Sequence, residues 1–379
     1  MKDFKAIVEA YRKVDFSQRK AALATVVGVR GSSYRSPGAR MLIMDDGRWT
    51  GSISGGCLEG DALRKARQVM VDLKPVTVTY DTREESNQNL GIGLGCNGVI
   101  DVLIEPVVSN DADNVIEKFA NLIDSDEPYV MATVFSGSEI GKRMVISKDQ
   151  TLFQNLNSNF ADVLHPDLKS IFETKRTEVR RVDDQEFFLE LFQPVVRVIL
   201  FGGGFDARPV SQLAKSIGWN VEVTDECVAH IAPIFFPDAD KLSLCQRQFI
   251  DRDFNITPYT ACVLISHNYE YDRDVLRKLL STPTPYIGIL GPRKRFDKMQ
   301  DELLSEGIVL SERDLRRIHS PAGLDIGAEA ADEIAVSIIA EIQSKFTHRQ
   351  GGFLKNRNAP IHSRAASGDE VFKEGFHFK

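Results

Sequence analysis

The stretch Val195-Val-Arg-Val-Ile-Leu-Phe-Gly-Gly-Gly-Phe-Asp-Ala207 decides the fold of the second half of the chain. Its first seven residues are almost all apolar, as in strands of parallel sheets that are covered on both faces. A glycine-rich turn follows, then a segment with helical spacing up to Gly218, and then a strand over 219–224 that ends at Asp225. This order of strand, glycine turn, helix, strand and acid predicts a Rossmann-like unit with a doubly wound parallel sheet.

The same unit contains candidate nucleotide-binding residues. The turn would contribute Gly202, Gly203, Gly204, Phe205, Asp206 and Ala207. Asp225 is suited to accept a hydrogen bond from a ribose 2′-hydroxyl, which favours NAD or another adenine nucleotide without a 2′-phosphate. His267 follows the expected strand 259–266, at the strand end where open α/β sheets bind ligands. Because Asp225 could merely end a strand and His267 could be a surface histidine, nucleotide binding remains open at this point.

Two glycine-rich stretches organise the first half of the chain: Gly31-Ser-Ser-Tyr-Arg-Ser-Pro-Gly-Ala-Arg40 and Thr50-Gly-Ser-Ile-Ser-Gly-Gly-Cys-Leu-Glu59. Glycine lets the backbone approach a ligand closely, and free N–H groups beside arginine make an anion site. Cys57 precedes an expected helix that ends near Leu73, so the helix dipole would favour its thiolate. Cys96 lies in a further run, Leu90-Gly-Ile-Gly-Leu-Gly-Cys-Asn-Gly98. The alternative is that both cysteines are small residues in ordinary turns.

Periodicity assigns the remaining segments to elements and domains. We expect an amphipathic helix over residues 2–15, a buried strand over 21–29, a hairpin around Asp45-Asp-Gly47, and a strand over 99–104 ended by Pro106. Residues 111–123 and 328–344 are expected to be helices, the second packed in a core or a dimer. The expected domains are a mixed α/β domain over 1–192, which includes short strands after residue 129, a Rossmann-like α/β domain over 193–345, and a polar extension over 346–379.

Composition excludes several classes of protein. The chain has 379 residues and a net charge of −7, with acids and bases mixed along it, so no nucleic-acid partner is expected. No apolar run reaches the roughly 18 residues of a membrane span, and the first residues lack a signal core, which predicts a cytoplasmic protein. The 5 cysteines form no CxxC pair, so neither a zinc ribbon nor a disulfide framework is expected, and no metal ligands are assigned.

Taken together, these motifs resemble the XdhC/CoxI family of maturation factors for xanthine dehydrogenase and carbon monoxide dehydrogenase. Beyond the stretches quoted above, the resemblance rests on Phe236-Pro-Asp-Ala-Asp240, Tyr286-Ile-Gly-Ile-Leu-Gly291, Ile318-His-Ser-Pro-Ala-Gly-Leu-Asp-Ile-Gly327 and Asp332-Glu-Ile-Ala-Val-Ser-Ile-Ile-Ala-Glu341. It implies a chaperone that binds the molybdenum cofactor, protects it while a cysteine desulfurase exchanges an oxo ligand for sulfur, and inserts it into an apo xanthine dehydrogenase-type molybdoenzyme. It also implies a homodimer without turnover of its own.

The residues themselves fit this chemistry, and on that basis our hypothesis assigns the molybdenum cofactor, or molybdopterin, to the first domain. The pterin phosphate would meet main-chain N–H groups and arginine, and the thiophilic molybdenum would meet cysteine. The expected cofactor-binding residues are Gly31, Ser32, Ser33, Arg35, Arg40, Ser54, Gly55, Gly56, Cys57, Glu59 and Cys96.

The second domain departs from the family pattern at three places. Phe205 stands where the family usually has His, Glu226-Cys227 follow Asp225 where Arg is frequent, and Pro292 replaces a common Ser. These changes put the ligand of the nucleotide pocket in doubt. The alternative function is an NAD-linked oxidoreductase built on this domain, with His267 as its acid–base group.

Overall fold

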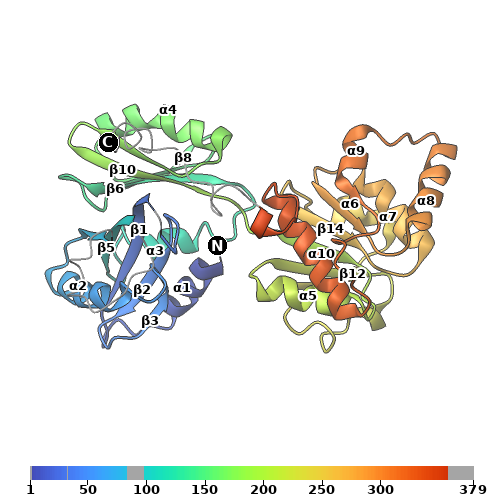
Figure 1. The fold of residues 1–379 in the computed structure, drawn as a ribbon, viewed down its shortest axis with the longest axis horizontal. Coiled ribbons are helices and arrows are strands. Elements are labelled where there is room, and N and C mark those ends of the chain that lie inside the picture. Colours follow the sequence, from blue (N-terminus) through green and yellow to red (C-terminus); the bar gives the residue numbers. More distant parts are fainter. Residues whose placement is uncertain (1, 32, 83–97, 357–379) are drawn as a thin grey trace, which may run out of the picture. The chain divides into compact units, whose positions relative to one another are not determined.

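The computed structural model describes residues 2–31, 33–82 and 98–356 of the 379-residue chain. The chain divides into two compact units, one containing residues 3–194 and the other beginning at residue 195. Figure 1 shows the first unit in blue to green and the second in yellow to red. The first unit contains two five-stranded sheets and the second a single six-stranded sheet.

The first sheet is antiparallel and has the strand order β3-β2-β1-β5-β4. Its strands are β1 (Ala21–Gly31), β2 (Arg40–Met44), β3 (Trp49–Gly51), β4 (Val76–Asp81) and β5 (Gly98–Val107). Helix α2 (Glu59–Asp72) packs on the face that carries Ala22 and Ala24. Because side chains alternate along a strand, Ala21 and Leu23 face the other way, toward α1 (Lys2–Arg12) and α3 (Val115–Ala120).

The second sheet is also antiparallel, with the order β8-β7-β6-β10-β9. Its strands are β6 (Tyr129–Ser136), β7 (Arg143–Ile146), β8 (Thr151–Gln154), β9 (Glu178–Val182) and β10 (Gln185–Phe192). Helix α4 (Ser158–Thr174) covers one face, and the other packs on the first sheet, where Phe135 and Phe188 meet Val27 and Leu103. The first unit is therefore layered as helix, sheet, sheet and helix (Figure 1).

The second unit is built on a fully parallel sheet with the order β13-β12-β11-β14-β15-β16. Its strands are β11 (Arg197–Phe201), β12 (Asn220–Asp225), β13 (Lys241–Leu244), β14 (Thr260–Leu264), β15 (Tyr286–Ile289) and β16 (Ile318–His319). Helices α5 (Ala207–Ser216) and α10 (Ala331–Phe346) pack on one face. The other face is covered by α6 (Ile250–Asp253), α7 (Tyr269–Leu279) and α8 (Arg293–Ser305), and α9 (Glu312–Arg317) precedes β16. The predicted mixed α/β unit followed by a Rossmann-like unit is confirmed.

Several predicted boundaries were wrong. Strand β5 continues through Pro106, which lies opposite Ala22 of β1. On its other side β5 pairs with β4 only as far as Ile104, so the missing N–H of Pro106 interrupts no hydrogen bonds between β4 and β5. The helix expected over 111–123 is shortened to α3, because the Asn114 side chain caps it by accepting from two main-chain N–H groups. Helix α4 was not predicted, and it contains Pro166, a residue that sequence reasoning takes as a helix breaker.

Helix α10 packs in the core of its own unit, since Ala335, Ile338 and Ile342 are fully buried there. The short 3-10 helix η2 (Val228–Ile231) follows β12, and η3 (Arg247–Phe249) and η4 (Leu354–Asn356) complete the described elements. Within the described ranges, no helix combines the length and the apolar character needed to cross a membrane.

Candidate functional site

The described strand ends that border the three glycine-rich stretches lie toward the same end of the first sheet, and residues 83–97, between β4 and β5, are outside the described residues. Strand β1 ends at Gly31, which pairs with Gly98 at the start of β5. Strand β3 ends at Gly51, opposite Met41 at the start of β2. Strand β4 ends at Asp81, opposite Val99. The stretches that the sequence singled out separately therefore begin or end at the same edge, although Ser32 and Cys96 lie outside the described residues.

The turn before α2 is organised by Glu59 and Ser54. The Ser54 main-chain N–H donates to Glu59 Oε1 at 3.0 Å, the Ser54 hydroxyl donates to Oε2, and the Ser52 hydroxyl donates to Oε1 at 2.9 Å. Burial alone would raise the pKa of Glu59, but these hydrogen bonds outweigh it and the pKa is lowered. Ser54 Oγ also accepts from the N–H groups of Gly56 and Leu58. Glu59 and Ser54 therefore shape the turn that precedes the helix.

Cys57 is partly exposed in this turn. Helix α2 begins at Glu59 with Leu58 as its N-cap, so Cys57 lies before the helix and not in its first turn. Next to it, Gly56 has a φ of +113°, and a Cβ built there would meet no atom within 4 Å. The Gly56 backbone therefore lies in an open part of the turn.

The loop after β1 lies directly against this turn. A Cβ on Gly55 would stand 3.3 Å from Tyr34 Cδ2, so the glycine lets the Tyr34 ring lie over the turn. Tyr34 remains 59% exposed. The Ser33 hydroxyl donates to the Arg35 carbonyl at 2.8 Å, and Arg35 reaches Asp3 at 3.0 Å on the surface. Two of the predicted loops are thus brought into contact, with an aromatic face and an accessible guanidinium beside the glycines.

Arg40 has a different environment from Arg35. It is 6% exposed, and its Nη1 donates to Glu190 Oε1 at 3.0 Å and to the Gly38 carbonyl at 2.8 Å. Its guanidinium also lies about 5 Å from the ring centres of Phe4 and Phe119. Because Glu190 neutralises it, this geometry favours a role in fixing the loop over the predicted contact with a cofactor phosphate.

Sequence reasoning missed two residues at this edge, Arg30 and Tyr34. The Arg30 side chain is 62% exposed and pairs with buried Asp101 at 3.0 Å. A basic residue at a strand end directly before a glycine was the signal that could have identified Arg30. Tyr34 stood inside the quoted motif, but only folding placed its ring over Gly55.

In the second unit, the glycines of the turn are needed by the chain itself. A Cβ on Gly202, whose φ is +123°, would stand 2.4 Å from Ser266 Cα. A Cβ on Gly203 would stand 2.5 Å from the His230 carbonyl oxygen. Helix η2 therefore packs directly on the turn between β11 and α5.

Asp225 is buried at the end of β12, as predicted, but its carboxylate is already engaged. It accepts from the N–H of Gly203 at 2.9 Å and from the N–H of Cys227 at 2.8 Å, and it contacts His230 Nδ1 at 3.0 Å. A carboxylate offers about four acceptor positions, so little capacity is left for a ribose hydroxyl. This geometry does not favour the predicted adenine nucleotide, which stays a prediction.

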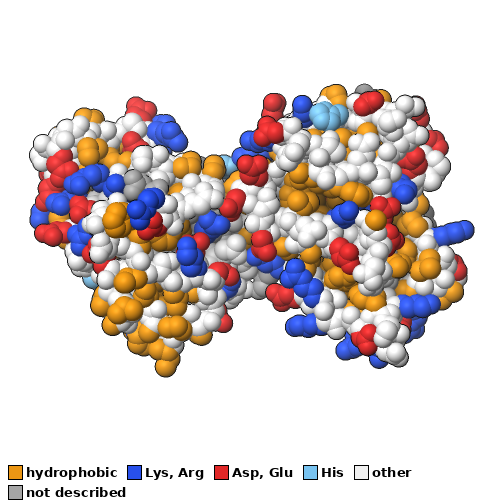
Figure 2. All heavy atoms as spheres, turned by 180° about the vertical axis from the view of Figure 1, so that it is seen from behind, with side chains coloured by type: hydrophobic (Ala, Val, Ile, Leu, Met, Phe, Trp, Pro, Cys, Tyr) orange, Lys and Arg blue, Asp and Glu red, His pale blue; other side chains and the backbone are white. Residues whose placement is uncertain are grey.

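His267 lies beside the turn, as expected from its place after β14. Its φ is +59°, an uncommon conformation for a residue with a side chain, and its Nε2 contacts Asp206 Oδ2 at 2.8 Å. The Phe205 side chain is 69% exposed. In the segment between β12 and β13, Val228 and Ile234 are 70% and 82% exposed. Hydrophobic side chains gather on the lower part of this unit in Figure 2. Ala207 is buried as the first residue of α5.

Of the remaining described cysteines, Cys227 is exposed, whereas Cys245 and Cys262 are buried and poorly suited to react. Burial raises the pKa of Cys245 to about 11 and that of Cys262 to about 12. Across the part of the chain that the structure describes, no group of His, Cys, Asp or Glu side chains has the arrangement of a metal site.

Both units of the chain match known protein families. The first is the double-sheet unit with glycine-rich connections, and the second is the Rossmann-like unit. The description "XdhC and CoxI family" matches residues 17–81, and "XdhC Rossmann domain" matches residues 198–342. Together with the similarity of a curated relative described next, these matches establish that the chain belongs to the XdhC and CoxI family, as its motifs predicted.

Three relatives span nearly the whole chain. A Bacillus subtilis protein, named as a probable subunit of xanthine dehydrogenase, is 33% identical, over 86% of this chain and 93% of its own length. The molybdenum cofactor insertion chaperone PaoD of Escherichia coli is 24% identical, over 92% of this chain and 90% of its own. A solved structure described as a xanthine dehydrogenase from Bacillus halodurans has a TM-score of 0.74 and 29% identity, covering 92% of this chain and 97% of that one.

Proposed function

We propose that this protein is a chaperone that binds the molybdenum cofactor and delivers it to a xanthine dehydrogenase-type molybdoenzyme. Support comes from two relatives that align with both units: one is named a molybdenum cofactor insertion chaperone and the other a probable part of a xanthine dehydrogenase. The cofactor is then cargo, which the protein must hold firmly enough to protect and loosely enough to release.

The observation that carries this proposal is the contact between two glycine-rich stretches, the loop after β1 and the turn before α2, where the Tyr34 ring lies against Gly55. The residues there suit a molybdate held by the dithiolene of a phosphorylated pterin. The guanidinium groups of Arg30 and Arg35 pair with Asp101 and Asp3 but, unlike that of Arg40, remain accessible at the surface, where they suit the phosphate. Cys57, which is partly exposed, suits the thiophilic metal. Tyr34 offers a flat exposed ring to the pterin.

The finer parts of the proposal concern sulfur and partners. A cysteine desulfurase would supply the sulfur that replaces an oxo ligand of the bound molybdenum, and Cys57 and Cys96 are the thiols of the first unit that could contact the metal during this exchange. The apo molybdoenzyme would then receive the sulfurated cofactor. We further propose that the protein acts in the cytoplasm as a homodimer.

The test is retention of the cofactor by the purified protein. The protein is mixed with released molybdenum cofactor, separated from unbound material and oxidised, and the fluorescent pterin is quantified. Near-stoichiometric retention is expected for the wild type, with a loss of at least about tenfold in an Arg35→Ala, Cys57→Ala variant, because about 1.4 kcal/mol of lost binding energy already gives this factor. Equal retention by the variant would contradict the assigned site, and no retention by the wild type would contradict the function.

A matched control is available at the opposite end of the same sheet. Arg48 lies beside the β2–β3 turn, and its side chain is 75% exposed and pairs with Asp46. Arg48→Ala removes the same charge without approaching the glycine-rich edge, so it should retain the cofactor. Arg40→Ala is unsuitable as a probe of binding, because Arg40 is buried and paired with Glu190.

NAD(H) titration separates this proposal from the oxidoreductase alternative. We expect no binding in the micromolar range, because Asp225 is engaged by Gly203, Cys227 and His230. Tight binding that is lost in Asp225→Asn would instead move the function to the second unit.

A further inference from the structure

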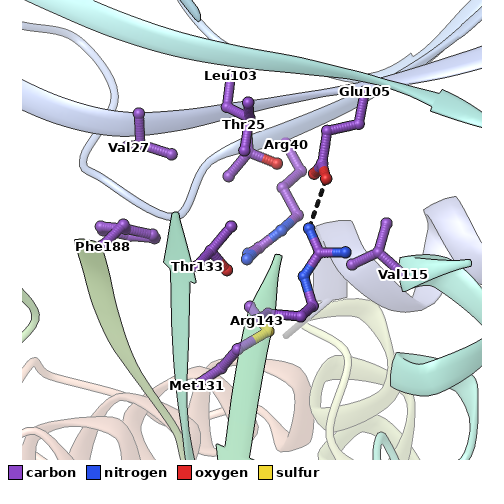
Figure 3. A pocket seen from close by; sticks show the side chains of 10 residues that line it. All are labelled: Thr25, Val27, Arg40, Leu103, Glu105, Val115, Met131, Thr133, Arg143 and Phe188. Carbon is purple, nitrogen blue, oxygen red and sulfur yellow. Dashed lines mark hydrogen bonds and ion pairs between the residues drawn. The ribbon is translucent and has the colours of Figure 1, made fainter. Parts of the chain in front are cut away.

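A small cavity lies between the two sheets of the first unit (Figure 3). Its volume is about 10 Å³, which is close to the minimum that one water molecule needs. Both sheets contribute to its walls, through Thr25 of β1 and Glu105 of β5 on one side and Thr133 of β6 and Arg143 of β7 on the other. Arg40, at the start of β2, also lines it.

Three buried polar atoms in this wall have no hydrogen-bond partner among the described residues. They are Arg40 Nε, Arg143 Nε and Thr133 Oγ1. The three side chains are 6%, 3% and 4% exposed, so bulk water does not reach them. Figure 3 shows the three residues next to one another around the cavity. Since buried polar groups nearly always have a partner, three such atoms around one cavity indicate a bound molecule.

The charged side chains around the cavity indicate whether its occupant is a neutral molecule or an ion. Arg143 Nη2 donates to Glu105 at 2.6 Å, and Arg40 is paired with Glu190. Two guanidinium groups are thus balanced by two carboxylates, and an added anion or cation would be a buried charge without compensation. The volume and the mixture of N–H donors with a hydroxyl suit a molecule that both accepts and donates.

We propose that this cavity binds a single water molecule, which accepts hydrogen bonds from Nε–H of Arg40 and Arg143 and donates one to the Thr133 hydroxyl oxygen. The water joins the two sheets through residues from β2, β6 and β7. Because Arg40 also holds the Gly38 carbonyl, the water supports the loop that follows β1. The site stands independently of the proposed cofactor binding.

The first test uses the sign of a stability change. Thr133→Val keeps the shape of the side chain and removes its hydroxyl. If water is bound, the substitution removes one of its partners and lowers the Tm of the first unit by at least about 2 °C. If the hydroxyl has no partner, the same substitution removes a costly buried polar group, so an unchanged or raised Tm overturns the proposal. Thr133→Ser is the control, because it keeps the hydroxyl, and the proposal requires it to retain the water.

The second test identifies the occupant directly. Crystals of the full chain, grown with bromide in place of chloride, are examined at a resolution that shows ordered water. A peak in the cavity within hydrogen-bond distance of Arg40 and Arg143, without anomalous signal from bromide, is the expected result. A bromide peak would show an anion site, and a cavity without density would show a dry one; either result overturns the proposal.

Discussion

Glu190→Ala is the substitution that tests most directly how the loop of the first unit is held. Glu190 and Arg40 are 8% and 6% exposed, and they form two hydrogen bonds across the interior. Removing the carboxylate leaves a guanidinium buried among the rings of Phe4, Phe119 and Phe192. A buried charge that has lost its partner typically costs about 3–5 kcal/mol.

The loss is large compared with the total stability of such a unit. Folded domains are stable by about 5–15 kcal/mol, and for a domain of 150–250 residues each 1 kcal/mol shifts the Tm by about 2–4 °C. We therefore expect Glu190→Ala to lower the Tm of the first unit by about 6–20 °C. The measurement is differential scanning calorimetry of the full chain, supported by urea unfolding.

The matched control removes a carboxylate from an exposed ion pair. Glu312 pairs with Arg316 at 3.3 Å, and the two side chains are 92% and 69% exposed. Glu312→Ala should cost less than about 1 kcal/mol, because water screens such pairs. The double variant Arg40→Met, Glu190→Leu should recover part of the loss, since it leaves no buried charge. A cost for Glu190→Ala as small as that of Glu312→Ala would show that the buried Arg40 does not depend on its carboxylate partner.

Three further outcomes follow from single positions. The pKa of Glu59 is lowered, so its ionised form stabilises the fold at pH values above the ordinary pKa of 4.5, and this contribution is lost as the pH falls through the lowered pKa. Glu59→Gln should therefore make the fall of Tm in acid less steep. An unchanged slope would argue against the assigned hydrogen bonds. Gly202→Ala should lower the free energy of unfolding in urea by more than about 2 kcal/mol, because Gly202 has a positive φ and a Cβ there would clash with the backbone of Ser266. Gly204→Ala should lower it by less than about 1 kcal/mol, because a Cβ fits there. Equal costs would contradict the described turn. Iodoacetamide at pH 8 should modify exposed Cys227 and spare buried Cys262 until the protein is unfolded, as read by peptide mass spectrometry.

Local pattern was enough for the elements that carry the second unit. The apolar run before Gly202, the glycines after it and the acid at position 225 all lie within one strand–helix–strand unit. Their spacing reflects constraints between near neighbours in the chain, so the Rossmann-like fold and the family could be predicted without coordinates. Helix α4 could not be predicted in this way, because its apolar face is stabilised by packing on the second sheet in spite of Pro166.

The types of residue at the candidate site, and the order of the elements that carry them, follow from the amino-acid order alone. Which of those residues are accessible depends on packing between segments. Arg35 and Arg40 belong to the same motif, yet one lies at the surface and the other is neutralised by a glutamate 150 positions away. Asp225 was correctly placed at the end of a strand, yet the N–H groups of Gly203 and Cys227 and the His230 ring already engage its oxygens. The type of a residue fixes which hydrogen bonds its side chain can donate or accept. Its partner, however, depends on contacts between segments of the folded chain. Those contacts therefore decide whether the residue can bind a ligand or only stabilises the structure.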